Sequence, residues 1–279
     1  MKIETRAKFP DFVGFVSGID LKKKLDDKIV QEIDNAINKL SVLVFKDQNI
    51  DDSEQVRFTK YFGEIEASGS KSNITKAKDR RLSTDLADVS NLDKNNKPLT
   101  KYDTRRIFNL GNRLWHTDSS FKKIPAKYSL LSARNISKKG GNTEFADMRN
   151  AYDYLDKQTK DKVKNMICEH SLIYSRQRLG FDMTKELSSE DIKNFIPVEQ
   201  PLVRKNNFTK RNTIFLSSHI GKIKDWIRPD SMCFIDDLIE YATQSKFKYI
   251  HKWSKDDLII WDNRQTMHRA RAYDDLTEN

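Results

Sequence analysis

The stretch LIIWDNRQTMH, residues 258–268, does most to decide the fold. Its first four residues form a continuous apolar run, which is typical of a buried strand, and residues 262–264 supply a polar turn. Similar short runs predict strands over residues 42–45 and 128–133, while isoleucine and leucine at three- and four-residue spacing predict a helix over residues 27–40. Short strands mixed with peripheral helices favour a mainly β fold with flanking helices, in one domain spanning residues 1–279.

Long polar stretches interrupt this pattern. Residues 67–105 and 176–212 are rich in charged and small polar side chains, and we expect both to be mobile loops, the first broken by one strand around residues 86–92. Residues 167–174 alternate in a way that predicts an extended segment between the two.

Composition and charge exclude several classes of protein. No apolar run approaches the roughly 20 residues of a membrane-spanning helix, and two cysteines, Cys168 and Cys233, cannot form a disulfide framework, so we expect a cytoplasmic protein with no membrane partner. The net charge is +10, from 51 basic and 41 acidic residues that are interspersed along the chain. No nucleic-acid-binding motif accompanies this charge. It therefore favours a small anionic substrate over a nucleic-acid partner.

One histidine of the five is followed two positions later by a carboxylate. His116 and Asp118, in the segment Trp115-His116-Thr117-Asp118, would point to the same face of a strand and could bind one metal ion together. Non-haem Fe(II) oxygenases combine such a pair with a second histidine and leave coordination positions open for substrates. The pair alone is weak support for a metal site, because spacings of this kind arise easily by chance.

Three histidines compete for the role of third ligand. His268 follows the apolar run, 150 residues after Asp118, a separation that suits a barrel in which a late strand returns beside an early one. His170 reads instead as a hydrogen-bonded core histidine, and His219 as a residue that lines a cavity. His251, between an isoleucine and a lysine, is expected at the surface or at a strand edge.

Three motifs stand in order along the chain: residues 114–121, residues 140–153, and residues 261–264 with His268. They resemble those of the taurine/2,4-D dioxygenase family, and the resemblance covers nearly the whole chain. Enzymes of this family depend on Fe(II) and 2-oxoglutarate and have a double-stranded β-helix (jelly-roll) core. Residues 118–121 and 147–153 look closer to the branch that cleaves 2,4-dichlorophenoxyacetate than to the taurine branch.

The resemblance assigns roles to individual residues by position. It implies that His116, Asp118 and His268 are the iron ligands. Thr143, after a double glycine, matches the threonine whose hydroxyl binds the distal carboxylate of 2-oxoglutarate, and Asn112 matches a polar residue beside the co-substrate or substrate.

The resemblance also implies how the substrate binds. Lys71 lies where the herbicide-cleaving branch has a lysine proposed to hold the substrate carboxylate, and Ser119 falls at a pocket-lining position. The implied reaction hydroxylates a small anionic compound, such as an aryloxyacetate, while O2 and 2-oxoglutarate are converted to succinate and CO2. We further expect a homo-oligomer. A taurine- or alkylsulfate-type dioxygenase is the alternative, and a catalytically inactive relative that acts as a binding protein is a second.

The C-terminus departs from the family pattern. The family places an arginine that pairs with 2-oxoglutarate about a dozen residues after the distal histidine, but here the sequence ends at Asn279. Arg269 and Arg271 are too close to His268 to match that position. We expect that the final strand and its arginine are missing from the sequence; the loss of this arginine would otherwise favour the inactive relative.

Overall fold

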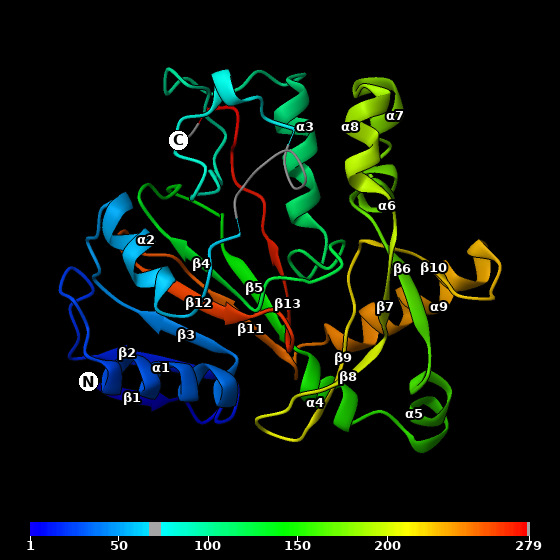
Figure 1. Ribbon diagram of the computed structural model, residues 1–279, viewed down its shortest axis with the longest axis horizontal. Coiled ribbons are helices and arrows are strands. Elements are labelled where there is room, and N and C mark those ends of the chain that lie inside the picture. Colours follow the sequence, from blue (N-terminus) through cyan, green and yellow to red (C-terminus); the bar gives the residue numbers. More distant parts are fainter. Residues whose placement is uncertain (67–73, 278–279) are drawn as a thin grey trace.

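In the computed structural model, which describes residues 1–66 and 74–277, sheets occupy the centre and helices surround them (Figure 1). The largest sheet has five strands in the order β1-β2-β3-β12-β4. Its strand β12 is the apolar run of the sequence, and it pairs antiparallel with both β3 and β4. A strand from the end of the chain thus lies between two strands from its first half. The bounds are β1 (Lys2–Thr5), β2 (Val13–Ser17), β3 (Val42–Phe45), β4 (Tyr128–Ser132) and β12 (Leu258–Asp262).

A second sheet places the late histidine beside the early part of the chain. Its three strands run in the order β11-β5-β13, all antiparallel: β5 (Thr143–Asp147), β11 (Lys248–His251) and β13 (Thr266–Ala270). His268, in the middle of β13, lies opposite Phe145 of β5. The short turn between β12 and β13 therefore carries the chain from the first sheet into the second.

The remaining strands form a third sheet and a hairpin. The third sheet has the order β10-β6-β7, and the hairpin pairs β8 with β9. The bounds are β6 (Ile167–His170), β7 (Val198–Pro201), β8 (Val203–Lys205), β9 (Asn212–Ile214) and β10 (Ile220–Ile223).

Helix α1 forms where the sequence predicts it, and both of the first two α-helices have side-chain caps. α1 (Asp27–Leu40) begins after Asp26, whose side chain accepts a hydrogen bond from the Ile29 N–H, and it buries Ile33 and Ile37. α2 (Asp52–Lys60) begins with a complete capping box. The other helices are η1 (Ala77–Asp79), α3 (Thr104–Asn109), η2 (Leu110–Arg113), α4 (Met148–Asp153), α5 (Lys157–Val163), α6 (Leu172–Gln177), α7 (Met183–Glu186), α8 (Ser189–Ile192), η3 (Lys193–Phe195) and α9 (Arg228–Ala242).

Helices α3, α6, α7 and α8 stand together at one end of the sheets (Figure 1). They share an apolar cluster in which buried side chains from the first half of the chain meet side chains from residues 172–195. This cluster, here called the upper cluster, has a buried core of Phe108, Leu172, Phe181, Met183 and Phe195. Among the described helices, none is long and apolar enough to cross a membrane.

Three expectations for the backbone were wrong or incomplete. The strand around residues 86–92 does not form; that segment contributes only an isolated bridge, Leu92 to Pro98. The extended segment 167–174 ends as a strand at His170, because the Ser171 side chain caps the N–H of Ile173 and starts α6. Residues 176–212 form short helices and strands rather than one long loop.

Candidate active site

Three side chains that could bind a metal ion converge where the second sheet meets the early motif. His116, Asp118 and His268 each place one ligand atom within 4.8 Å of the others, and they are the one such group in residues 1–66 and 74–277. The backbone creates this arrangement. The N–H of His116 donates to the carbonyl of His268 at 3.0 Å, and the N–H of His268 donates back at 2.8 Å. An isolated antiparallel bridge thus brings together residues that lie 152 positions apart.

The two imidazole rings present their Nε2 atoms to the same carboxylate oxygen. His116 Nε2 lies 3.5 Å and His268 Nε2 lies 3.7 Å from Asp118 Oδ1. Both distances are longer than a hydrogen bond, which is the spacing expected of atoms that share a cation rather than a proton. His116 Nδ1 lies 2.8 Å from the Leu114 carbonyl. A carbonyl can only accept, so Nδ1 carries the proton and Nε2 keeps its lone pair for a metal.

Asp118 is oriented by a chain of hydrogen bonds that the sequence did not suggest. Ser129 Oγ on β4 donates to Asp118 Oδ2 at 2.7 Å. Asn263 Nδ2 donates to Ser129 Oγ at 2.8 Å, and Trp261 Nε1 donates to Asn263 Oδ1 at 3.0 Å. One carboxylate oxygen is therefore held by the protein and the other faces the histidines. Residues 261–264 stand out in the sequence as a polar turn and as part of a family motif, but neither pattern indicates that two of them support Asp118.

The charge states of these groups suit metal binding. Burial alone would raise the pKa of Asp118, but the neighbouring His268 and His116 outweigh burial and hold the pKa of Asp118 far below its usual range. Burial lowers the pKa of His268 to about 3. The site therefore offers one carboxylate and a neutral imidazole at neutral pH, which are the protonation states that a metal ion requires.

The other histidines do not join this group. The His219 ring lies 5.9 Å from the His116 ring, and its Nδ1 is 3.0 Å from Ser175 Oγ. His170 is fully buried, as expected of a core histidine, but neither of its ring nitrogens has a hydrogen-bond partner among the described residues. His251 was expected at the surface or at a strand edge. It lies on β11, an edge strand of the second sheet, but the surface expectation was wrong: His251 is 2% exposed and bonds Tyr249 and Asp257.

Comparison with known proteins agrees with this geometry. Residues 5–278 match the family model described as taurine catabolism dioxygenase TauD, TfdA family. The chain belongs to this family. It is 36% identical over 275 residues, 98% of this chain and 91% of the relative, to an alpha-ketoglutarate-dependent 2,4-dichlorophenoxyacetate dioxygenase of Burkholderia sp. (strain RASC).

A solved structure and a more distant relative refine the placement within the family. The crystal structure of AAD-2 in complex with Mn(II) and N-oxalylglycine is 50% identical, with a TM-score of 0.94 over 99% of this chain and 94% of that chain. An alkylsulfatase of Acinetobacter baylyi is only 26% identical over 260 residues, 91% of this chain and 75% of the relative. This dioxygenase is an Fe(II)- and 2-oxoglutarate-dependent enzyme of the 2,4-D type of the family, and the taurine- and alkylsulfate-type relatives are more distant.

The two residues expected to bind 2-oxoglutarate lie on elements next to those that carry the three converging side chains: β5 pairs with β13, and η2 precedes His116. Thr143 begins β5, two residues before the partner of His268, and is buried. Its Oγ1 accepts a hydrogen bond from Trp253 Nε1 at 3.0 Å. The Thr143 hydroxyl proton therefore has no part in that bond and can be donated elsewhere. Asn112 lies in η2, the short 3-10 helix that leads into His116.

The two residues expected to bind the substrate have different outcomes. Ser119 is buried directly after Asp118, and its Oγ donates to Glu66 Oε1 at 2.9 Å. A pocket-lining role would require Ser119 to share this hydroxyl with Glu66. Lys71 lies outside the described residues, so its position is not known.

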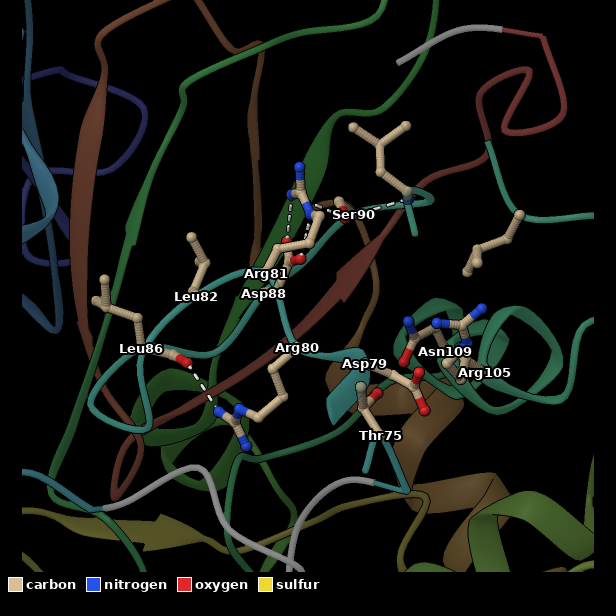
Figure 2. Close-up of a pocket in the computed structure, with 12 residues that line it drawn as sticks. Thr75, Asp79, Arg80, Arg81, Leu82, Leu86, Asp88, Ser90, Arg105 and Asn109 are labelled. Carbon is tan, nitrogen blue, oxygen red and sulfur yellow. Dashed lines mark hydrogen bonds and ion pairs between the residues drawn. The ribbon is translucent and has the colours of Figure 1, made fainter. Parts of the chain in front are cut away.

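A pocket in residues 75–109 lies apart from the three converging side chains and contains none of them (Figure 2). Three arginines line it: Arg80 donates to the backbone carbonyls of Ser83 and Leu86, and the other two are paired with carboxylates. Arg81 grips both oxygens of Asp88, with Nε–Oδ2 at 2.7 Å and Nη2–Oδ1 at 2.8 Å, as Figure 2 shows. Arg105 pairs with Asp103 at 2.7 Å. These charges are neutralised within the protein, so the pocket is a weak candidate for an anionic ligand.

Proposed function

We propose that this enzyme hydroxylates an aryloxyacetate or a similar small carboxylate, and that His116, Asp118 and His268 hold its Fe(II). The observation that carries the proposal is the convergence of two Nε2 atoms and one carboxylate oxygen, with the second carboxylate oxygen anchored by Ser129. This is the two-histidine, one-carboxylate donor set of non-haem iron oxygenases. When bound, iron would supply the oxidative chemistry that couples decarboxylation of 2-oxoglutarate to hydroxylation of the substrate.

The protein would orient 2-oxoglutarate through Thr143. The hydroxyl of Thr143 already accepts from Trp253, which fixes the direction of its lone pairs and leaves its proton to be donated to the distal carboxylate of the co-substrate. We place Asn112, on η2, beside the co-substrate or substrate. Asn112 is supported by its place four residues before His116, and Thr143 by its place on β5, which pairs with the strand of His268.

The substrate would present the carbon between its carboxylate and its ether oxygen to the metal. Hydroxylation of that carbon gives a hemiacetal, which collapses to a phenol and glyoxylate. Lys71 would bind the substrate carboxylate, and Ser119 would line the pocket. The 2,4-D relative supports an aryloxyacetate, and the +10 net charge of the chain supports an anion in general.

The architecture and assembly form part of the same proposal. We assign the first and second sheets to the two faces of a jelly roll, because β12 and β13 are consecutive strands that belong to different sheets. Residues 1–279 would form one dioxygenase domain. We further propose a cytoplasmic homo-oligomer.

Succinate release tests the function. The purified enzyme should release succinate with Fe(II), 2-oxoglutarate, O2 and an aryloxyacetate, and turn over taurine or an alkyl sulfate at least tenfold less efficiently. Equal or better turnover of taurine or the sulfate would refute the choice of substrate but not the iron chemistry.

A histidine pair tests the ligand assignment. Replacing His268 with alanine should abolish turnover and weaken metal binding, because one of three ligands is lost. His219→Ala is the matched control, since His219 is also buried and lies near His116 without belonging to the group. Turnover that survives in His268→Ala but not in His219→Ala would show that the third ligand is wrong.

A further inference from the structure

Arg176, on α6, is a buried arginine that no carboxylate of residues 1–66 and 74–277 neutralises. Its side chain is 4% exposed and lies within the upper cluster, with its guanidinium 4.1 Å above the Phe108 ring. Its Nη1 donates to Ser175 Oγ at 2.8 Å, while its Nε is buried with no partner among the described residues. Burial lowers the pKa of Arg176 to about 10, so the side chain is still charged at neutral pH.

Arg149, a second buried arginine, has the partners expected of an arginine that only stabilises the fold. Arg149 is 1% exposed, but Asp147 accepts from its Nε and Nη2, and two backbone carbonyls accept from Nη1 and Nη2, so four of its five protons are bonded. A buried charge without such partners destabilises a protein by several kcal/mol, roughly, unless a ligand completes it. Arg176 has the burial of Arg149 without the partners.

Hydrogen bonds through Ser175 link Arg176 to His219, which lies next to the proposed metal ligand His116. Ser175 Oγ, which accepts from Arg176, is also bonded to the ring of His219, and that ring lies 5.9 Å from His116 and 5.0 Å from Phe121. Arg176 thus approaches the proposed metal site from α6, beside the third sheet. Thr143 approaches it from the second sheet, so the two residues reach the site from different parts of the fold.

Gly111 packs against the Arg176 guanidinium, and a larger residue would not fit there. A Cβ atom on Gly111 would lie 2.4 Å from Arg176 Cζ and 2.8 Å from its Nε, so any other residue would displace the guanidinium. Gly111 is the neighbour of Asn112 on η2. Nη1 donates to Ser175, so the edge of the guanidinium formed by Nε and Nη2 is the one that a ligand could occupy. This is one of the edges that binds a carboxylate through two parallel hydrogen bonds.

We propose that Arg176 binds the carboxylate of the organic substrate through this edge and makes the enzyme selective for anions. The inference rests on the proposed function, in which the substrate is a small carboxylate with an aromatic ring. The ring would lie against Phe108, which contacts the guanidinium, and Phe121, which packs against the upper cluster and the His219 ring.

The test compares a charged ligand with its neutral analogue. Dissociation constants for an aryloxyacetate and its primary amide are measured by calorimetry. The protein is loaded with Mn(II) and 2-oxoglutarate, so that it binds either compound without converting it. In Arg176→Met, affinity for the carboxylate should fall about 10- to 150-fold, the effect of losing a hydrogen bond to a charged group. Affinity for the amide should stay within about threefold.

Two further variants separate binding from folding. Arg178→Met, two residues further along and paired with Asp236 at the surface, should change neither constant. Gly111→Ala keeps the arginine but pushes its guanidinium aside, so it should lower carboxylate affinity in the same selective way. The melting temperature of ligand-free Arg176→Met should rise, because an unpaired buried charge is replaced by an apolar side chain of similar length.

Each outcome bears on one of the two proposals. Equal losses for the carboxylate and the amide, or no loss for either, would overturn the role of Arg176, as would a fall in melting temperature with unchanged selectivity. If the wild type instead binds a sulfonate or a sulfate, the choice of aryloxyacetate fails. The same comparison of that anion with its neutral analogue then still decides whether Arg176 binds it. A wild type that prefers no anion over its neutral analogue would overturn the Arg176 proposal directly.

Discussion

Replacing Ser129 with alanine should loosen the metal site without touching a ligand. Ser129 Oγ is the group that holds Asp118 Oδ2, at 2.7 Å, and so directs Oδ1 towards the two histidines. Asn263 donates to the same Ser129 oxygen, which commits the serine proton to Asp118. Without the hydroxyl, the carboxylate can rotate, and Asn263 loses an acceptor.

The size of the effect follows from the bond that is lost. A hydrogen bond to an ionised group contributes about 1.5–3 kcal/mol, and removal of a group that orients a metal ligand typically weakens metal binding about 10- to 100-fold. We expect Ser129→Ala to weaken Mn(II) binding by that factor, measured by competition with a chromophoric chelator. Asp118 should remain ionised, because its histidine neighbours, rather than Ser129, do most to lower its pKa.

A second serine on the same strand provides the control. Ser132 lies three residues further along β4, so its side chain points to the opposite face, and its hydroxyl has no hydrogen-bond partner among the residues described. Ser132→Ala should leave metal affinity unchanged. If the two variants bind Mn(II) equally well, the hydrogen-bond chain from Trp261 to Asp118 does not support the site, and the reasoning is refuted.

Two further predictions concern the co-substrate and pH. Thr143→Val should weaken apparent 2-oxoglutarate affinity about 5- to 150-fold, the effect of about 1–3 kcal/mol, in a succinate-release titration, whereas Thr143→Ser should retain it. Burial and the positive charge of Arg204 lower the pKa of His170 to about 3 in the folded protein. The unfolded chain, with a histidine pKa of about 6.5, takes up the proton first, so His170 makes stability fall as the pH drops from about 6.5 towards 3. Between pH 8 and pH 5 this loss is on the order of 2 kcal/mol, and His170→Phe should remove it in urea unfolding at the two pH values. An equal pH dependence of the two proteins would contradict the assignment.

Local patterns were sufficient to predict the elements whose signals are short-range. Helix α1 was visible because its apolar spacing and the preceding Asp26 cap act within a few residues of each other. Strand β12 was visible because a strand covered on both faces is apolar at every position, and all of its residues are buried. The strand expected over residues 86–92 failed because extended propensity alone does not provide a neighbouring strand with which to pair.

The sequence by itself determined which side chains were available for chemistry: one His-X-Asp pair, a late histidine and a threonine after two glycines. It could not choose among His268, His219 and His170, because that choice depends on a backbone bridge across 152 residues. Only the tertiary structure decided that β13 returns beside His116, that Ser129 and Asn263 hold Asp118, and that Arg176 is buried without a carboxylate. The physical reason is that hydrogen bonds and burial depend on proximity in space, whereas sequence patterns report proximity along the chain.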